Sequence, residues 1–348
     1  MSKNLFYDLS YIDLDNYLKS IRQPSFRTKQ IWQGVYINFW DKPEDFTNIP
    51  KELRTRLFED FSFSSMKPTV QLNSSDLETT KTLFSLQDQT GIEAVLMKYD
   101  QRRTLCISTQ VGCAMGCVFC ATGQMGFTRH LSAGEIIEQV LFYAKLLNQT
   151  DEKVTNIVLM GMGEPFHNYE ATMQAINTLN DHSGFDLGAR RFTVSTVGLV
   201  PMIRRFADEN VQVNLAISLH AANDTERSLL LPINKKYDIV QVIEACQYYI
   251  NKTNRRITFE WALIAGKNDD EKTARELAGL LKGLLCHVNV IPLNPTGQDE
   301  YAPSTKNQTY VFKNILEEQG IPCTIRLRRG IDIQAGCGQL AVKHQSKK

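Results

Sequence analysis

Hydrophobic positions between residues 104 and 319 follow two periods that alternate along the chain. Short β-branched runs predict strands, and the longer stretches between them carry apolar residues at three- and four-residue steps, as amphipathic helices do. This alternation predicts an α/β fold with a parallel sheet and outer helices, built as a partial, open β/α barrel; a doubly wound sheet is the alternative. The predicted strands are Thr104–Ser108, Thr155–Met160, Phe192–Thr196, Val213–Ser218, Ile257–Leu263 and Val288–Ile291. The predicted helices are Ala133–Leu147, Tyr169–Asn180, Val200–Glu209, Ile239–Lys252, Asp270–Leu285 and Lys306–Gln319.

The first 98 residues show different patterns. Helical periodicity over residues 1–66 predicts a small N-terminal helical accessory domain, for which substrate docking and plain packing are both open interpretations. Residues 67–98 shift to a period of two and predict a β-hairpin connection around a glycine-containing turn. The predicted core then covers residues 99–332, followed by a C-terminal tail at residues 333–348. The predicted N-terminal helices are Tyr11–Ile21, Arg27–Phe39 and Lys51–Phe58, and the hairpin strands are Thr82–Leu86 and Ile92–Lys98.

Length and charge narrow the function classes. The 348 residues, 43% of them hydrophobic, suffice for one barrel-sized core and a smaller appendage. No apolar run approaches membrane-spanning length, and the N-terminal residues lack a signal-peptide pattern, so a cytoplasmic location without a membrane partner is expected. With a net charge of +1, any nucleic-acid surface depends on local clusters. Arginine pairs are candidates, although each also fits a solvated face: Arg102-Arg103, Arg190-Arg191, Arg204-Arg205, Arg255-Arg256 and Arg328-Arg329.

Three of the eight cysteines stand in a C-x3-C-x2-C run at Cys113, Cys117 and Cys120. Such short gaps bring three thiolates to one inorganic centre. Four thiolates would complete the shell of an iron–sulfur cube, so three leave one iron open to a substrate. A structural zinc site is the alternative, but no fourth ligand follows at similar spacing, since His130 is the nearest histidine. The run therefore predicts a cluster with an open iron.

Polar and glycine-rich residues follow the predicted strands directly. The carboxyl ends of parallel strands build the active site in such folds, so these residues are expected around one mouth with the cysteine run. A turn, a helix cap or a packed ring explains each residue taken alone. They are Gly163, Glu164, Ser195, Ser218, Leu219, His220 and Asn294.

The remaining candidates lie outside the cysteine run. Cys106 is on the first predicted strand, and Cys337 lies between two glycines in the tail, where a mobile backbone would leave its sulfur accessible as a nucleophile. Glu93 falls among apolar residues of the second hairpin strand, where an exposed carboxylate is the commoner explanation. The other three cysteines are assigned to the core: Cys246, Cys286 and Cys323.

The cysteine run resembles the cluster loop of the radical S-adenosylmethionine (SAM) enzymes. Nearly the whole chain resembles the RlmN-type RNA methyltransferases, through the motifs CISTQVGCAMGCVFCATGQMGF, MGMGEP, STVG, SLHAAND, LPINKKY and GIDIQAGCGQLA. The resemblance implies one 4Fe–4S cluster on the three cysteines, two SAM molecules per turnover in one binding mode at the strand-end residues, and a monomer. It implies methylation of adenine C2 in 23S rRNA, at the peptidyl transferase centre, and in tRNA beside the anticodon. An external electron donor such as flavodoxin is implied as well.

The resemblance also implies three catalytic roles. The first SAM methylates Cys337, and the radical formed from the second takes a hydrogen from that methyl group. The resulting carbon radical adds to adenine C2, with Glu93 accepting the C2 proton. Cys106 then releases the product and leaves a Cys106–Cys337 disulfide that a reductant must reset.

Two alternatives to C2 methylation stay open. The Cfr type uses the same cysteines on adenine C8, but Val111 occupies the position of an extra cysteine in Cfr sequences, and Arg326–Gly330 is closer to the C2 enzymes. A non-catalytic iron–sulfur or RNA-binding protein would consume no SAM. Gln334 and Gly336 stand where an acid and an alanine are more usual, which concerns loop stiffness and not the sulfur.

Overall fold

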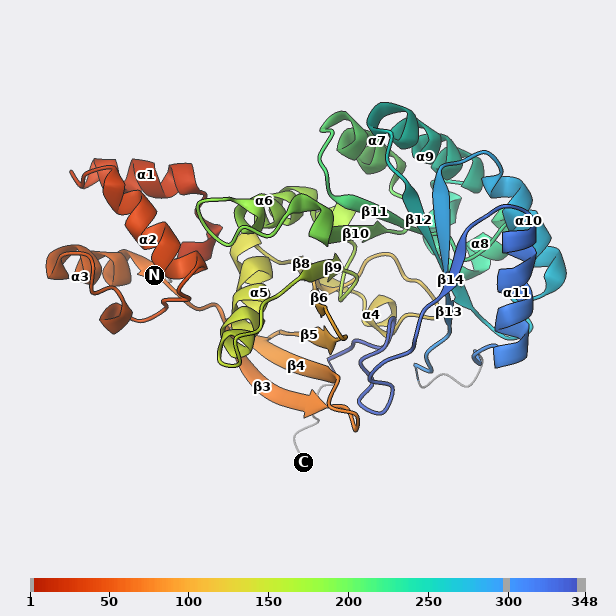
Figure 1. The fold of residues 1–348 in the computed structure, drawn as a ribbon, viewed down its shortest axis with the longest axis horizontal. Helices are drawn as coiled ribbons and strands as arrows, with labels where there is room; N and C mark the ends of the chain where they lie inside the picture. The colour runs from red at the N-terminus through yellow and green to blue at the C-terminus, as the bar shows by residue number, and fades with distance from the viewer. Residues whose placement is uncertain (1–2, 297–300, 343–348) are drawn as a thin grey trace.

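The structure is a computed structural model that describes residues 3–296 and 301–342, and its centre is a ten-stranded sheet (Figure 1). The parallel strands are β6 Arg103–Cys106, β9 Asn156–Leu159, β10 Phe192–Thr196, β11 Asn214–Ser218, β12 Ile257–Leu263, β13 Cys286–Pro292 and β14 Cys323–Ile325. They lie in chain order from β6 to β14, without the reversal that defines a doubly wound sheet. In the described chain the sheet does not close on itself, which confirms the predicted partial barrel.

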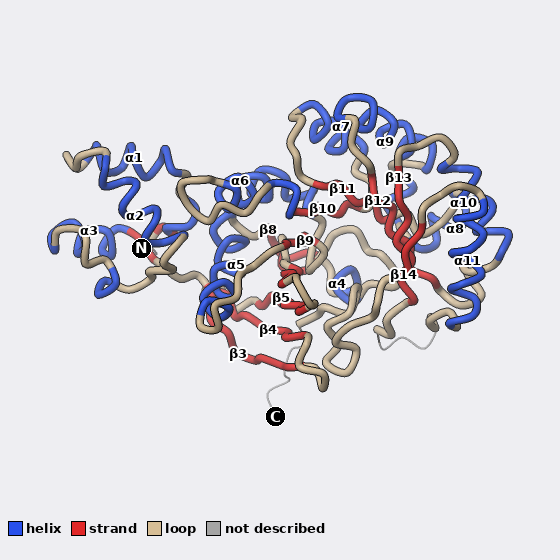
Figure 2. Tube along the Cα trace, viewed as in Figure 1, coloured by secondary structure: helices blue, strands red, loops and turns tan. Residues whose placement is uncertain are grey.

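Helices cover one side of the parallel strands. Figures 1 and 2 show α6, α7, α9, α10 and α11 along the outer side of the curved sheet, with α4 and the C-terminal segment on the inner side. A right-handed crossover after each successive strand places the helices on the same face. The bounds are α4 Ala121–Gln124, α5 Ala133–Asn148, α6 Tyr169–Asn180, α7 Val200–Asp208, α8 Asp224–Leu230, α9 Ile239–Thr253, α10 Glu271–Leu281 and α11 Lys306–Glu318. Short 3-10 turns occupy Pro165–Asn168, Ala189–Arg191 and Pro232–Lys235.

An antiparallel end extends the sheet. Its strands are β3 Met66–Asn73, β4 Thr79–Leu86 and β5 Gly91–Lys98. The β4–β5 hairpin was predicted as a connection, and its strand β5 pairs directly with β6, so this segment also extends the core sheet. Beyond Met66, β3 is exposed along its whole length and contains Pro68 beside a register shift. Its apolar residues alternate with polar ones, but a proline within a run argues against a strand, and β3 was not predicted as one.

The N-terminal residues form a helical unit beside α5. It contains α1 Tyr11–Ser20, α2 Phe26–Tyr36 and α3 Lys51–Asp60, with 3-10 turns at Phe6–Asp8 and Pro43–Asp45 and a short parallel pair of β1 Asn4–Leu5 with β2 Phe61–Ser62. Buried aromatic rings fill its centre, including Trp32 and Phe46. The Asp8 carboxylate accepts a hydrogen bond from Gly134 N at 2.7 Å, where a Cβ atom would meet Leu5 at 2.5 Å. The unit is therefore fixed to the first turn of α5.

Element ends differ from prediction where the chain breaks its own pattern. Helix α10 stops at Leu281 and not at Leu285, because Gly283 has a φ of +82°. Helix α8 and strand β14 are too short for their periodicity to stand out, and were not predicted. No helix among the described residues is both apolar enough and long enough to cross a bilayer.

Candidate active site

The cysteine run forms a loop between two short antiparallel strands, β7 Gln110–Gly112 and β8 Phe127–His130. Gly112 has a φ of +73°, and a Cβ atom there would lie 1.9 Å from Gly126 O. Only glycine allows this approach, in which Gly126 O accepts a hydrogen bond from Cys113 N at 2.8 Å. The first cysteine is thereby fixed at the base of the loop.

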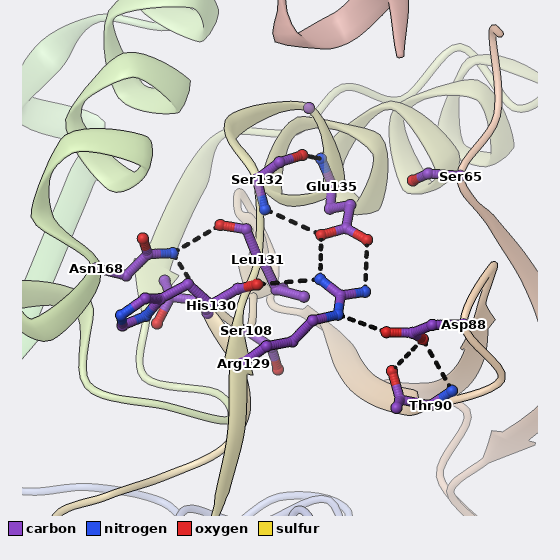
Figure 3. A network of polar contacts seen from close by, with 12 residues as sticks. Ser65, Asp88, Thr90, Ser108, Arg129, His130, Leu131, Ser132, Glu135 and Asn168 are labelled. Atoms are coloured by element: carbon purple, nitrogen blue, oxygen red, sulfur yellow. Dashed lines mark hydrogen bonds and ion pairs between the residues drawn. The ribbon is translucent and has the colours of Figure 1, made fainter. Parts of the chain in front are cut away.

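A polar network holds this ribbon to its surroundings (Figure 3). The Arg129 guanidinium on β8 donates to both carboxylate oxygens of Glu135 at 2.8 Å, and to Asp88 in the β4–β5 turn at 2.5 Å. Glu135 also belongs to the capping box of α5 with Ser132. Because the network joins β8, α5 and the hairpin, it fixes the ribbon from which the cysteine loop projects.

One pocket at the carboxyl ends of the strands gathers most of the predicted site. The three loop cysteines line it together with Cys337. Six of the seven predicted strand-end residues also line it: Gly163, Glu164, Ser195, Ser218, His220 and Asn294. The exception is Leu219, whose fully buried side chain lies in the hydrophobic core because alternation along the strand turns it away from Ser218. A contact between Leu219 and SAM stays a prediction.

Glu164 is a buried carboxylate held on three sides. Its Oε1 accepts from Phe166 N at 3.0 Å and its Oε2 from Val197 N at 2.9 Å, while its own N–H donates to Gln110 Oε1 at 2.8 Å. Burial raises its pKa to about 7. Neighbouring Gly163 has a φ of +106°, and a Cβ atom there would meet the Gln110 side chain at 2.6 Å. An ammonium group arriving at Glu164 would offset the cost of burying its charge.

His220 and Asn294 contribute differently to the pocket. Burial lowers the pKa of His220 to about 3, so its ring is neutral, and its Nδ1 accepts from Ala262 N at 2.9 Å. The ring packs edge-on against Phe119 of the cysteine loop. Asn294 Nδ2 donates to Cys337 O at 3.1 Å, whereas its buried Oδ1 has no hydrogen-bond partner among the described residues. That oxygen is available to a ligand donor.

Cys106 and Cys337 line a second pocket that adjoins the first. The two pockets share Met160, Ile291, Asn294, Cys337 and Leu340. Both cysteines are free thiols. Desolvation raises the pKa of Cys106 to about 12 and that of Cys337 to about 11, opposed in each case by the guanidinium of Arg326. Cys337 remains solvent-accessible because it faces the pockets, although protein atoms surround it.

The described part of the tail is docked, whereas the sequence predicted a mobile backbone. Gly338 O accepts from Ala121 N at 2.8 Å, and Leu340 O from Thr122 Oγ1 at 2.6 Å. Gln339 Nε2 donates to Pro295 O at 2.7 Å. These bonds hold the three residues after Cys337 against α4, which directly follows the cysteine run, and against the segment after β13. Residues 343–348 of the predicted tail lie outside the described residues.

Glu93 is buried but does not line either cysteine pocket. Its carboxylate lies 3.0 Å from Lys81 Nζ and accepts a hydrogen bond from Ala341 N at 3.0 Å. The sequence favoured an exposed carboxylate at this strand position, but the tail covers Glu93 and buries it. Its role as the proton acceptor stays a prediction.

Comparisons with known proteins agree with this geometry. Residues 107–278 match the Radical SAM superfamily, and residues 3–62 match the ribosomal RNA large subunit methyltransferase N-terminal domain. The chain is 46% identical over 343 residues to a probable dual-specificity RNA methyltransferase RlmN from Staphylococcus aureus (strain JH9), which covers 99% of this chain and 94% of the relative. The chain belongs to the RlmN family of radical SAM methyltransferases. The crystal structure of a radical SAM methyltransferase from Sphaerobacter thermophilus superposes on this RlmN-family chain with a TM-score of 0.95 at 48% identity, covering 97% of this chain and 99% of that one.

The RlmN family implies a 4Fe–4S cluster and SAM, and the residues present fit both. Soft cysteine thiolates are the usual ligands of iron–sulfur clusters, and three line one pocket. Burial raises the pKa of Cys113 to about 12 and that of Cys117 well above its usual value, a cost that the positive charge of iron offsets. Within residues 3–296 and 301–342, no three His, Cys, Asp or Glu side chains lie close enough together to bind a single metal ion. Asn294 Oδ1 and the Glu164 carboxylate supply acceptors suited to the amine and hydroxyl groups of SAM.

Sequence reasoning missed several residues of this RlmN-family site. Gln110 accepts the hydrogen bond of the Glu164 N–H from the ribbon, and Arg326 lines the second pocket together with Cys106 and Cys337. Lys81 pairs with Glu93 from the adjacent strand. Only the last carried a signal, because opposite charges on neighbouring hairpin strands indicate a cross-strand pair.

Cys117→Ala is expected to bind at least about tenfold less iron than the wild type after anaerobic reconstitution. Loss of an outer contact to a ligand already lowers metal affinity about 10–100-fold, and loss of a direct ligand should lower it further. Iron and sulfide analysis measures this, beside zinc analysis of the wild type. Cys286→Ala, at a buried position on β13 outside both pockets, is the matched control and should keep wild-type iron. Unchanged iron in Cys117→Ala, or zinc in place of iron in the wild type, would contradict the cluster assignment.

Proposed function

We propose that this RlmN-family protein methylates C2 of adenine in 23S rRNA, at the peptidyl transferase centre, and in tRNA, beside the anticodon. The position of Cys337 carries the proposal, because this thiol borders the pocket of the three cluster cysteines and also the pocket of Cys106. The match of residues 3–62 to a ribosomal RNA methyltransferase domain and the printed name of the Staphylococcus aureus relative support RNA as the substrate.

The two pockets suit a reaction at an unreactive carbon. Adenine C2 has no nucleophilic lone pair and cannot displace a methyl group from a sulfonium. The bound cluster and SAM supply both the methyl group and the radical chemistry that a direct transfer lacks. Among the residues of the chain, the Cys337 sulfur carries the methyl group, Glu93 accepts the C2 proton, and Cys106 attacks Cys337 to release the product. Gly163, Glu164, Ser195, Ser218, Leu219, His220 and Asn294 are proposed to contact SAM, one molecule for each of the two steps.

The second pocket also offers groups for a nucleotide. Arg326, Arg328 and Arg329 line it with Tyr99, and the Arg329 guanidinium lies 4.3 Å from the centre of the Tyr99 ring. Guanidinium groups bind phosphates, and aromatic rings stack on unpaired bases. An adenosine taken out of its stack would reach Cys106 and Cys337 at this place.

Further partners follow from the same chemistry. The Cys106–Cys337 disulfide left after each cycle needs an external reductant, and an electron donor such as flavodoxin is proposed for the cluster. Residues 1–66 are proposed as an RNA-docking unit, residues 67–98 as its connection to the radical SAM core at 99–332, and residues 333–348 as the tail that carries the methyl group. A cytoplasmic monomer fits these roles.

The decisive experiment identifies the methylated nucleoside. A strain lacking C2 methylation is complemented with this chain, and its rRNA and tRNA are digested and analysed by mass spectrometry against 2-methyladenosine and 8-methyladenosine standards. We expect 2-methyladenosine in both RNAs. Formation of 8-methyladenosine without the 2-methyl isomer would establish the Cfr-type activity instead, and absence of both together with unconsumed SAM would favour a non-catalytic protein.

A further inference from the structure

A buried ion pair lies under the C-terminal tail, outside the pocket of the cluster cysteines. Lys81 Nζ on β4 is 3.0 Å from Glu93 Oε1 on β5, with side chains only 9% and 7% exposed. Lys81 pairs with Val95 and Glu93 with Leu83 across the two strands, which makes the charged residues diagonal neighbours on one face. The strand register therefore fixes the pair independently of the tail.

Each member of the pair also binds the tail, on opposite sides of Cys337. Lys81 Nζ donates to Gln334 O at 3.1 Å, three residues before Cys337. Glu93 Oε2 accepts from Ala341 N at 3.0 Å, four residues after it. The ammonium thus meets a carbonyl and the carboxylate meets an amide. Two backbone points that bracket the reactive sulfur are held by one ion pair.

The tail supplies what a buried ion pair requires. Desolvated charges are stable only when further hydrogen bonds satisfy them, and Gln334 O and Ala341 N provide these bonds. Gln334 adopts a φ of 53°, a left-handed conformation unfavourable for a residue with a side chain, so local preference does not explain the tail's path. Lys81 and Glu93 line a third pocket, which lies between the sheet and the tail. Apolar side chains of β3 and β4 line it as well: Val70, Leu72 and Leu83. Figure 1 shows the C-terminal segment running past this end of the sheet.

We propose that the Lys81–Glu93 ion pair is a clamp that holds the tail in its docked position and that Lys81 is a positioning residue for the Cys337 sulfur. The clamp itself depends only on the contacts described, whereas its effect on methyl transfer rests on the proposed function. Without the Lys81 charge the tail opens more often, so Cys337 spends less time facing both pockets. SAM is then cleaved without productive transfer to RNA.

The test compares Lys81→Met, which keeps most of the length of the side chain and removes its charge, with the conservative Lys81→Arg. Lys67→Met, at an exposed lysine on β3, is the matched control. Both measurements use the reconstituted full-length protein without RNA. We expect Lys81→Met to raise the rate of Cys337 alkylation by iodoacetamide at least about fivefold, and to raise the rate of amide hydrogen exchange at residues 334–341 as well. Lys81→Arg and Lys67→Met should stay within about twofold of the wild type.

A reaction readout separates positioning from general stability. The ratio of 5′-deoxyadenosine formed to adenosine methylated should rise at least about threefold in Lys81→Met and return towards the wild-type value in Lys81→Arg. A merely structural role would lower both products together and leave the ratio unchanged, which would overturn the positioning role. Because Lys81 also contacts Glu93, the proposed proton acceptor, a raised ratio without faster alkylation of Cys337 would assign the effect to that carboxylate and would likewise overturn the positioning role. The alkylation and exchange measurements need no methylation, so they test the clamp even if the proposed function fails.

A second variant covers the case in which Lys81→Met does not fold. Ala341→Pro removes the N–H that binds Glu93 and leaves the ion pair and the sheet unchanged. Ala341→Pro should also raise the rate of Cys337 alkylation by iodoacetamide at least about fivefold. Wild-type alkylation and exchange in Ala341→Pro, or in a folded Lys81→Met, would overturn the clamp.

Discussion

Cys337→Ala is expected to stop methylation of both RNAs, lowering the rate by at least about 10³-fold, because among the described residues Cys337 is the thiol that lines both the cluster pocket and the Cys106 pocket. The substituted side chain is small and faces the pockets, so the fold should be unaffected. We expect no residual methylation, since adenine C2 does not react with a sulfonium methyl group. The loss should therefore appear in the rate of transfer and not in the affinity for RNA.

Anaerobic assays with methyl-labelled SAM measure this effect on 23S rRNA fragments and on tRNA. Peptide mass spectrometry of the wild type should show a thioether at residue 337, which Cys337→Ala cannot form. Cys323→Ala, at a buried thiol on β14 outside both pockets, is the matched control and should keep wild-type methylation. Methylation by Cys337→Ala, or a wild-type peptide that never carries the thioether, would show that the methyl group takes another path.

The parallel strands were predictable because they are buried. Strands β10 and β12 match their predicted ranges, Phe192–Thr196 and Ile257–Leu263, since both combine β-branched or aromatic residues with clear helical stretches on either side. By contrast, β3 is an exposed edge strand that contains Pro68, which argues against a strand, and β14 is three residues long. A local hydrophobic pattern therefore predicts an element best when the element buries much apolar surface.

The composition of the main pocket was predictable for a different reason. Residues after parallel strands must meet at one edge of the sheet, so the strand assignment alone placed Glu164, Ser195, Ser218 and Asn294 near the cysteine run. Leu219 shows the limit of this reasoning, because alternation turns neighbouring side chains to opposite faces.

The docking of the tail could not be predicted from local pattern. Lys81 meets the tail across 253 residues of sequence and Glu93 across 248. Both contacts are made to backbone atoms, which every residue carries, so no side-chain pattern in the tail marks them. The glycines around Cys337 predicted a mobile backbone, whereas the folded tail is held by hydrogen bonds that only the structure shows.

Cys106→Ala is expected to trap the RNA on the protein. In the proposed reaction, release requires the Cys106 sulfur to attack Cys337, and the two sulfurs must approach to about 2 Å when the disulfide forms. The shared pocket makes this approach short, because Cys106 lies on β6 and Cys337 on a tail docked beside it. Without the Cys106 thiol the adenine stays joined to Cys337 through its methylene bridge, so turnover should fall to at most one methyl group per chain.

The trapped species is measured as a band of reduced mobility on denaturing gels that disappears after ribonuclease treatment, and as a Cys337 peptide carrying one adenosine. Cys106→Ala with Cys337→Ala provides the control, since removing the attachment sulfur must abolish the band. If Cys106→Ala instead released methylated adenosine over several turnovers, another group would resolve the intermediate. Because the protein adduct forms before release, its appearance would also place Cys106 after carbon–carbon bond formation in the reaction sequence.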